Sequence, residues 1–142
     1  MRLATKFMVM VFCLCALVAC GKKKDAGEGL VAQEACGPAS SEITQTNLPA
    51  HFPDLDGVIY TATAAQGPST TVTGYANNTL TGLFKDLQEK FGEDPYAILK
   101  KEKDEHDAEV NFSSDQDKVT GQVALAEECK GRLHVRVIVR PT

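Results

Sequence analysis

The sequence contains no tryptophan and few other aromatic residues, with six phenylalanines and three tyrosines in 142 residues. This scarcity argues against a sugar-binding site built on aromatic stacking. Basic residues are also in the minority, because 15 Lys and Arg stand against 19 Asp and Glu for a net charge of −4. An acidic chain without a basic patch interleaved with aromatic residues argues against a nucleic-acid partner.

Motifs of catalytic and metal-binding chemistry are missing as well. The chain has no G-x-S-x-G nucleophile motif and no glycine-rich loop that would cradle a phosphate. His51, His106 and His134 do not stand at metal-ligand spacing with another histidine, a cysteine or a pair of carboxylates. The acidic stretches 54–57 and 115–117 lack the downstream glutamate and the ligand ladder of a calcium loop, which favours turns. We therefore expect no metal, no cofactor and no catalytic activity.

No apolar run is long enough to span a bilayer, which takes about 20 residues. The longest run, Phe7 to Val18, is uncharged and follows the basic residues Arg2 and Lys6, as in an export signal. It leads into Leu17-Val18-Ala19-Cys20, with a small residue directly before the cysteine. These four residues resemble the lipobox of bacterial lipoproteins, in which the cysteine is acylated and becomes the new N-terminus. A membrane anchor or an ordinary signal peptide with a coincidental cysteine is the alternative.

The lipobox resemblance implies a cell-envelope protein, held outside the cytoplasm by acyl chains on Cys20. Residues 1–19 would be the signal peptide, and 20–35 a flexible tether rich in glycine and charge. Residues 36–142 would form a single domain, because they suffice for one core. Gly21 is not the aspartate that usually signals inner-membrane retention, so in a host with two membranes we expect the outer membrane.

The lipoprotein interpretation also resolves the five cysteines. Cys13 and Cys15 leave with the signal, Cys20 carries the lipid, and Cys36 and Cys129 remain as a pair. Export implies an oxidising compartment, where a disulfide is the expected state of such a pair. It would close a loop of about 90 residues, which the chain-entropy model values at roughly 4.5 kcal/mol.

The first half of the domain predicts a hairpin and one helix. Residues 58–63 and 70–75 are rich in β-branched residues and flank a turn at 66–69, which predicts two paired strands. A single apolar stripe then predicts a helix that Asn78 caps and Gly92 ends, with the stripe formed by Leu80, Leu83, Leu87 and the phenylalanines at 84 and 91. Residues 96–107 fit either a helix starting at Pro95 or a strand, and the strand is favoured because another strand follows directly.

The C-terminal third alternates apolar and polar residues with period two over 108–113, 119–125 and 133–140, with turns at 115–117 and 129–131. Clean alternation indicates an antiparallel sheet with one buried face and one wetter face. The predicted fold class is therefore α+β. A small antiparallel sheet of about five to six strands, in β-β-α-β-β-β-β order, carries one helix on its apolar face.

The wetter sheet face is the candidate binding surface, because arginine is enriched at protein interfaces. Its predicted residues are Glu109, Gln122, His134, Arg136, Ile138 and Arg140. We expect a non-catalytic binding or structural module of the envelope, with an envelope protein as its partner. One alternative is an inhibitor or immunity-type lipoprotein that blocks a hydrolase through loop 64–69 or 103–107. The other is a small-ligand binder with its site between helix and sheet.

Overall fold

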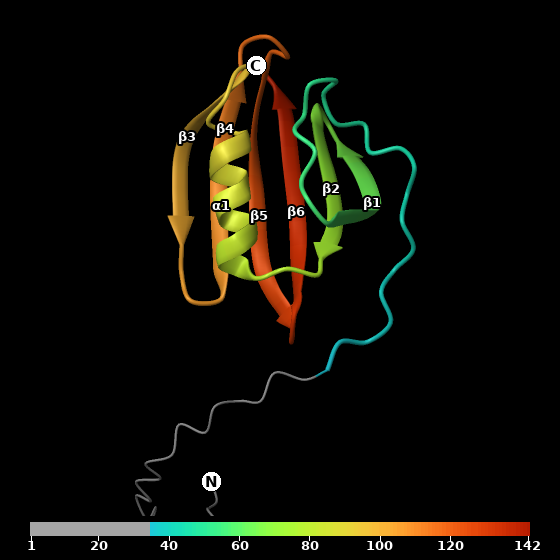
Figure 1. Ribbon diagram of the computed structural model, residues 1–142. Coiled ribbons are helices and arrows are strands. Elements are labelled where there is room, and N and C mark those ends of the chain that lie inside the picture. The colour runs from blue at the N-terminus through green and yellow to red at the C-terminus, as the bar shows by residue number, and fades with distance from the viewer. Residues whose placement is uncertain (1–34) are drawn as a thin grey trace, which may run out of the picture. The chain divides into compact units, whose positions relative to one another are not determined.

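The computed structural model describes residues 35–142, and the predictions for the signal peptide, Cys20 and most of the tether lie outside the described residues. The domain is one six-stranded sheet with a single helix against one face (Figure 1). Every neighbouring pair of strands is antiparallel, in the spatial order β1-β2-β6-β5-β4-β3. The elements are β1 (Val58–Gln66), β2 (Ser69–Ala76), α1 (Leu80–Lys90), β3 (Tyr96–Lys103), β4 (Asp107–Ser114), β5 (Val119–Cys129) and β6 (Arg132–Pro141).

This architecture confirms the predicted α+β class and the predicted element order. Residues 96–103 form the strand β3, so the favoured interpretation of that segment is right and the helix starting at Pro95 is not formed. The predicted helix cap is wrong by one residue. Helical dihedral angles begin at Leu80, so the extended residue before it, Thr79, is the cap, and its hydroxyl accepts the Gly82 N–H at 3.1 Å. Asn78 instead accepts the backbone N–H of Thr79.

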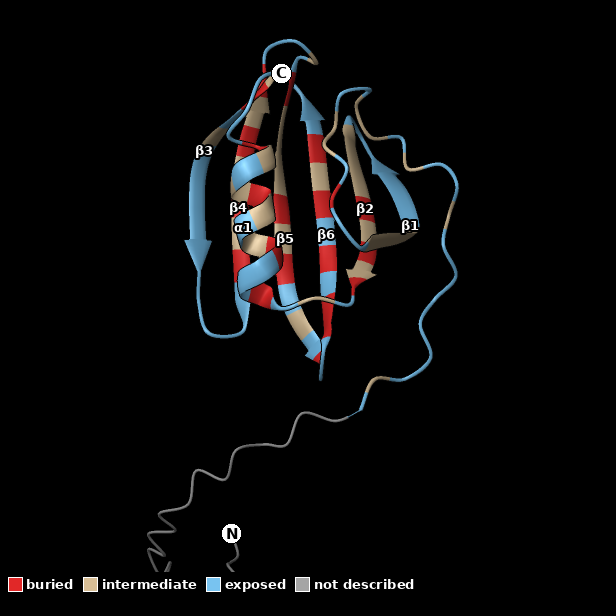
Figure 2. Cartoon of the chain, viewed as in Figure 1, coloured by how far each residue is buried: buried red, intermediate tan, exposed pale blue. Residues whose placement is uncertain are grey.

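The core lies between the sheet and α1, and Figure 2 shows buried bands alternating with less buried ones along β6. Leu83, Leu87 and Phe91 on the helix side are completely buried. The rings of Phe91 and Phe112 stack with their centroids 4.5 Å apart. Phe52, from the irregular segment before β1, meets both rings edge-on. The helix and this segment therefore close the same face of the sheet.

The irregular segment before β1 is fastened to the sheet at several points. Cys36 forms the predicted disulfide with Cys129 at the end of β5, with 5.2 Å between their Cα atoms. Farther along, the Ile43 N–H donates to the Tyr60 carbonyl at 2.9 Å, so the segment runs beside the edge strand β1. Among the described residues, no helix is long and apolar enough to cross a membrane. The face of the sheet opposite α1, called the open face below, carries the candidate site.

Candidate functional site

The open face is centred on β6, one of the two middle strands of the sheet. Leu133, Val135, Val137 and Val139 point into the core and are buried, so the residues between them point the other way. His134, Arg136 and Arg140 are exposed there, and Ile138 is half-buried. Alternation along one strand thus produces a row of three basic side chains interrupted by one apolar side chain.

The arginines of this row face no carboxylate on the neighbouring strands. Arg136 pairs in register with Thr73 on β2 and Ala124 on β5. Arg140 pairs with Thr120 on β5. Within residues 35–142, neither guanidinium forms a hydrogen bond or an ion pair. A carboxylate at one of these paired positions would have neutralised the arginine opposite it. These two charges therefore stay available to a partner.

Arg132, at the start of the same strand, shows what a structural arginine looks like in this fold. Its guanidinium donates to Glu128 at 3.0 Å and to the Gly37 carbonyl at 2.9 Å, and it lies over the Tyr75 ring. It is 9% exposed. Arg132 thus holds the segment next to the disulfide in place, whereas Arg136 and Arg140 form no hydrogen bond or ion pair with the described residues.

The acidic residues of the open face lie on β3 and β4, and Glu109 and Glu102 among them are already engaged. Glu109 on β4 accepts a hydrogen bond from the Asn111 amide at 2.5 Å. Glu102 on β3 pairs with Lys100 at 2.8 Å, and that hydrogen bond raises the pKa of the lysine. The face is therefore divided into a basic row on β6 without ion pairs and an acidic border on β3 and β4, which also includes Asp107.

A shallow hollow of about 240 Å³ lies beside the basic row. Its apolar lining residues are Leu99, Ile138 and the buried Phe112, and Leu99 is 62% exposed, the one large apolar side chain that is so exposed among residues 35–142. Leu99 sits at a β-bulge between Ile98 and Lys100, outside the regular pairing with β4. Polar side chains complete the lining, namely Asn111, Thr120, Gln122 and Arg140. The hollow can accept an apolar group with polar neighbours.

A second hollow, of about 260 Å³, lies farther along the same face. The small side chains of Ala124 and Ala126 on β5 leave this hollow open between two basic residues of β6, Arg136 and His134, and two acidic residues of β4, Asp107 and Glu109. All six residues predicted for the wetter face therefore lie on the open face, and Gln122 pairs directly with Ile138. The sequence did not indicate Leu99, because its segment was not assigned firmly to a strand. Alternation from the inward-facing Tyr96 and Ile98 was the signal that could have found it.

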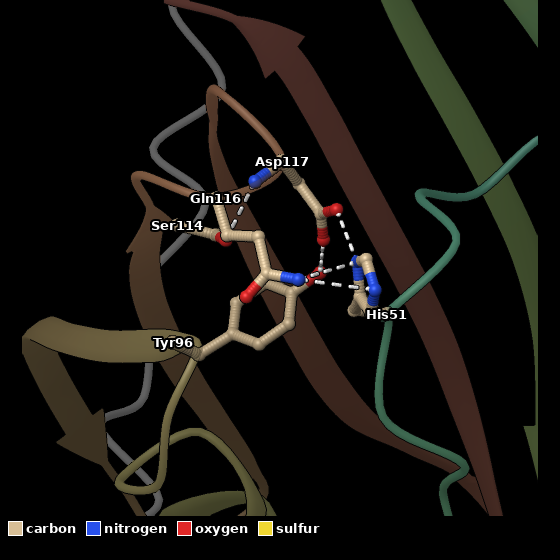
Figure 3. A network of polar contacts seen from close by, with 5 residues as sticks. All are labelled: His51, Tyr96, Ser114, Gln116 and Asp117. Atoms are coloured by element: carbon tan, nitrogen blue, oxygen red, sulfur yellow. Dashed lines mark hydrogen bonds and ion pairs between the residues drawn. The ribbon is translucent and has the colours of Figure 1, made fainter.

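A separate polar network lies where the segment before β1 meets the β4–β5 turn (Figure 3). The Nδ1 atom of His51 lies 2.7 Å from the Asp117 carboxylate, and the Tyr96 hydroxyl donates to the same carboxylate at 2.8 Å. The hydrogen bond from His51 holds the pKa of Asp117 below its ordinary value. Burial, together with the bond to Asp117, raises the pKa of Tyr96.

This network has the form of a clamp rather than of a catalytic site. His51 is engaged at both ring nitrogens, because the Gln116 amide lies 3.1 Å from its Nε2 atom. The hydroxyl of Ser114, a buried residue, accepts a hydrogen bond from the Asp117 backbone N–H at 3.1 Å (Figure 3). A histidine–carboxylate pair activates a nucleophile only when the nucleophile lies within reach of the free ring nitrogen. Here the pair joins two segments 66 residues apart in the sequence.

In the part of the chain that the structure describes, no group of three or more His, Cys, Asp or Glu side chains is placed to hold a metal ion. Comparison of the chain with protein-family models finds no match, and comparison with curated proteins finds none either.

Proposed function

We propose that this protein is a lipid-anchored, non-catalytic docking module of the bacterial cell envelope, which binds a protein partner on the open face of its sheet. The resemblance of Leu17-Val18-Ala19-Cys20 to a lipobox supports the anchor and the location outside the cytoplasm. The observation that carries the docking role is the pair of uncompensated arginines beside an exposed leucine. Arginine is enriched at protein interfaces, and the fully buried centre of an interface is more apolar than ordinary surface.

The chemistry of the open face favours binding over catalysis. Guanidinium, amide and hydroxyl groups can hold a partner by charge and hydrogen bonds. Nucleophilic or acid–base catalysis needs a nucleophile or a proton-transfer group aimed at one reacting atom. The groups around the hollow beside Leu99 are spread over a shallow surface and offer no such pair.

The shape of the molecule favours a protein over a small molecule as the ligand. Small-ligand sites are clefts of about 300–1,000 Å³ that enclose most of the ligand. The two hollows on the open face are smaller than this and lie on a sheet surface. The space between helix and sheet is filled by Phe91, Phe112 and Leu87, all completely buried, so a ligand there would have to displace the core. A broad, shallow face matches a protein surface better.

The test of docking is photo-crosslinking in native envelopes with the full-length chain. A photoreactive residue replaces Gln122, which lines the hollow and pairs with Ile138. The control carries the same residue at Glu89, whose side chain is 63% exposed on the outer side of α1. We expect a discrete protein adduct from position 122 that position 89 does not give. Equal and diffuse adducts at both positions would contradict the docking role, and a hydrolase in the adduct would identify the module as an inhibitor.

The test of the anchor uses the same chain with Cys20→Ser. The substitution removes the residue that would carry the acyl chains. Stable anchoring takes more than one such chain, so the variant should bind the membrane only weakly. We expect the variant to leave the membrane fraction, while Cys36→Ser, which removes a cysteine of the disulfide instead, stays in it. Retention of the Cys20→Ser protein in the membrane would rule out the lipid anchor.

A further inference from the structure

The basic row has a spacing that an extended segment can match. Arg136, Ile138 and Arg140 alternate on one strand, so their side chains leave the same face in steps of about 6.6 Å. The order along the row is cation, apolar, cation. A second extended chain that runs along β6 on this face presents its own alternate side chains with the same step.

On the two strands next to β6, the residues that pair in register with this row are uncharged. Ile138 lies between Thr71 of β2 and Gln122 of β5 in the pairing register. Asp107 and Glu109 are the carboxylates of the second hollow, and Glu109 pairs with Ala124 and is thus two strands away from Arg136. In a chain with a net charge of −4, two neighbouring arginines without a counter-charge form a local exception. Their natural complement is a pair of carboxylates, which arginine binds with charge-assisted hydrogen bonds.

We propose that the open face binds an extended acidic segment of a partner protein, with one carboxylate two residues before an apolar residue and another two residues after it. This inference rests on the proposed docking function. The two carboxylates meet Arg136 and Arg140. The apolar side chain between them enters the hollow beside Ile138 and Leu99. The recognition pattern in the partner is therefore acid-x-apolar-x-acid.

The acidic border of the face favours a protein segment over an anionic polymer. A uniform polyanion could follow β6, but any part of it that extended beyond the basic row toward β4 and β3 would meet Glu109 and Glu102, and like charges brought together cost binding energy. A polyanion would also leave Leu99 without an apolar contact. A protein segment avoids both, because it can place two carboxylates on the basic row and uncharged residues over the border. The Asn111 and Gln122 amides in the hollow can also bond its backbone.

The experiment repeats the crosslinking from position 122 with the full-length chain, in three versions. One is otherwise native, one carries Arg136→Glu and Arg140→Glu, and one carries Lys85→Glu and Lys130→Glu. Both lysines are exposed, one on α1 and one in the β5–β6 turn, so the third version changes the net charge equally away from the open face. We expect the arginine reversals to lower capture at least about tenfold and the lysine reversals to leave it unchanged. Mass mapping of the adduct should locate an acid-x-apolar-x-acid segment.

The possible outcomes distinguish a failure of the acidic-segment inference from a failure of the docking function on which it rests. A discrete partner captured equally well by the arginine reversals, or crosslinked through a segment without carboxylates, would overturn the acidic-segment inference and leave docking intact. An adduct with a glycan or a lipid would also overturn it. Absence of any discrete adduct in the otherwise native version would defeat the docking function itself. Circular dichroism of each version checks folding, and Arg136→Gln with Arg140→Gln should reduce capture to an intermediate level.

Discussion

The two faces of the sheet follow different rules, although the same strands supply both. On the covered face, every side chain of β6 from Leu133 to Val139 is buried in a continuous apolar core closed by α1. On the open face, the residues between them include charged groups without counter-charges and lie beside an exposed leucine. The covered face is explained by the free energy of folding, because the burial of apolar area is the main force that drives a chain to fold. The exposed charges and the exposed leucine of the open face are not explained by the burial of apolar area.

This difference separates residues that hold the fold together from residues that the fold does not need. Exposed arginine and leucine side chains contribute little to stability. Arginine, by contrast, is enriched at protein interfaces, whose buried centres are also more apolar than ordinary surface. Substitutions on the two faces should therefore have separable effects, large on unfolding for one face and large on capture for the other.

The largest expected effect comes from the covered face, at Phe112. Its ring stacks on Phe91 and occupies the space next to Gly121, where an added Cβ would lie 2.4 Å from the ring. We expect Phe112→Ala to lower the free energy of unfolding by about 3–5 kcal/mol, because it leaves a cavity in the tightest part of the core. Urea unfolding of the purified protein measures this change.

The matched control is Asn111→Ala, the preceding residue on the same strand but on the open face. It loses one hydrogen bond to Glu109, which corresponds to about 1 kcal/mol or less. If both substitutions destabilised the protein equally, the covered face would have no greater share in stability than the open one, and the comparison of the faces would fail.

A smaller effect is expected at Asp117, in the clamp where the irregular segment meets the β4–β5 turn. Its pKa is lowered by the hydrogen bond from His51, so the ionised carboxylate stabilises the folded protein. This contribution is fully present above the unfolded pKa of about 3.9 and is lost as the pH falls through the lower folded pKa. Asp117→Asn should therefore lower stability by about 1 kcal/mol at neutral pH, with a difference that shrinks below about pH 4.

Urea unfolding of Asp117→Asn at pH 7 and at pH 3 tests this expectation. Asp115→Asn is the control, since Asp115 is an exposed acid in the same turn. If Asp117→Asn lowered the free energy of unfolding equally at both pH values, the ionised carboxylate of Asp117 would not be the form that stabilises the folded protein.

Much of the fold could be predicted from the sequence because the strands of the C-terminal third have a strict period of two. A slip of one residue along β6 would turn Val135 and Val137 toward solvent, so the pattern itself determines which residues face the core. The disulfide was predictable for a different reason, because Cys36 and Cys129 are the only cysteines after Cys20. Each prediction depended on one strong constraint, which was the period of two for the strands and the single remaining pair of cysteines for the disulfide.

Features without a local pattern could not be predicted. Phe52 packs into the core from an irregular segment that has no period. His51 and Asp117 are 66 residues apart, and no feature of either stretch points to the other. For the open face, alternation assigned the six predicted residues to one side. The lack of counter-charges around Arg136 depends on which strands are neighbours, and the sheet order supplied that information.

The smallest effect on stability, and the sharpest test of the comparison, comes from two adjacent residues of β6. Arg136→Gln removes an exposed charge without partners among the described residues, so we expect the free energy of unfolding to change by less than about 0.5 kcal/mol. Val137→Thr keeps the side-chain shape but buries a hydroxyl on the other face, which should cost about 1–3 kcal/mol. Capture of the partner should show the reverse order, with Arg136→Gln the weaker binder. If Arg136→Gln destabilised the protein as much as its neighbour, the arginine would belong to the fold, and the open face would lose its main argument for docking.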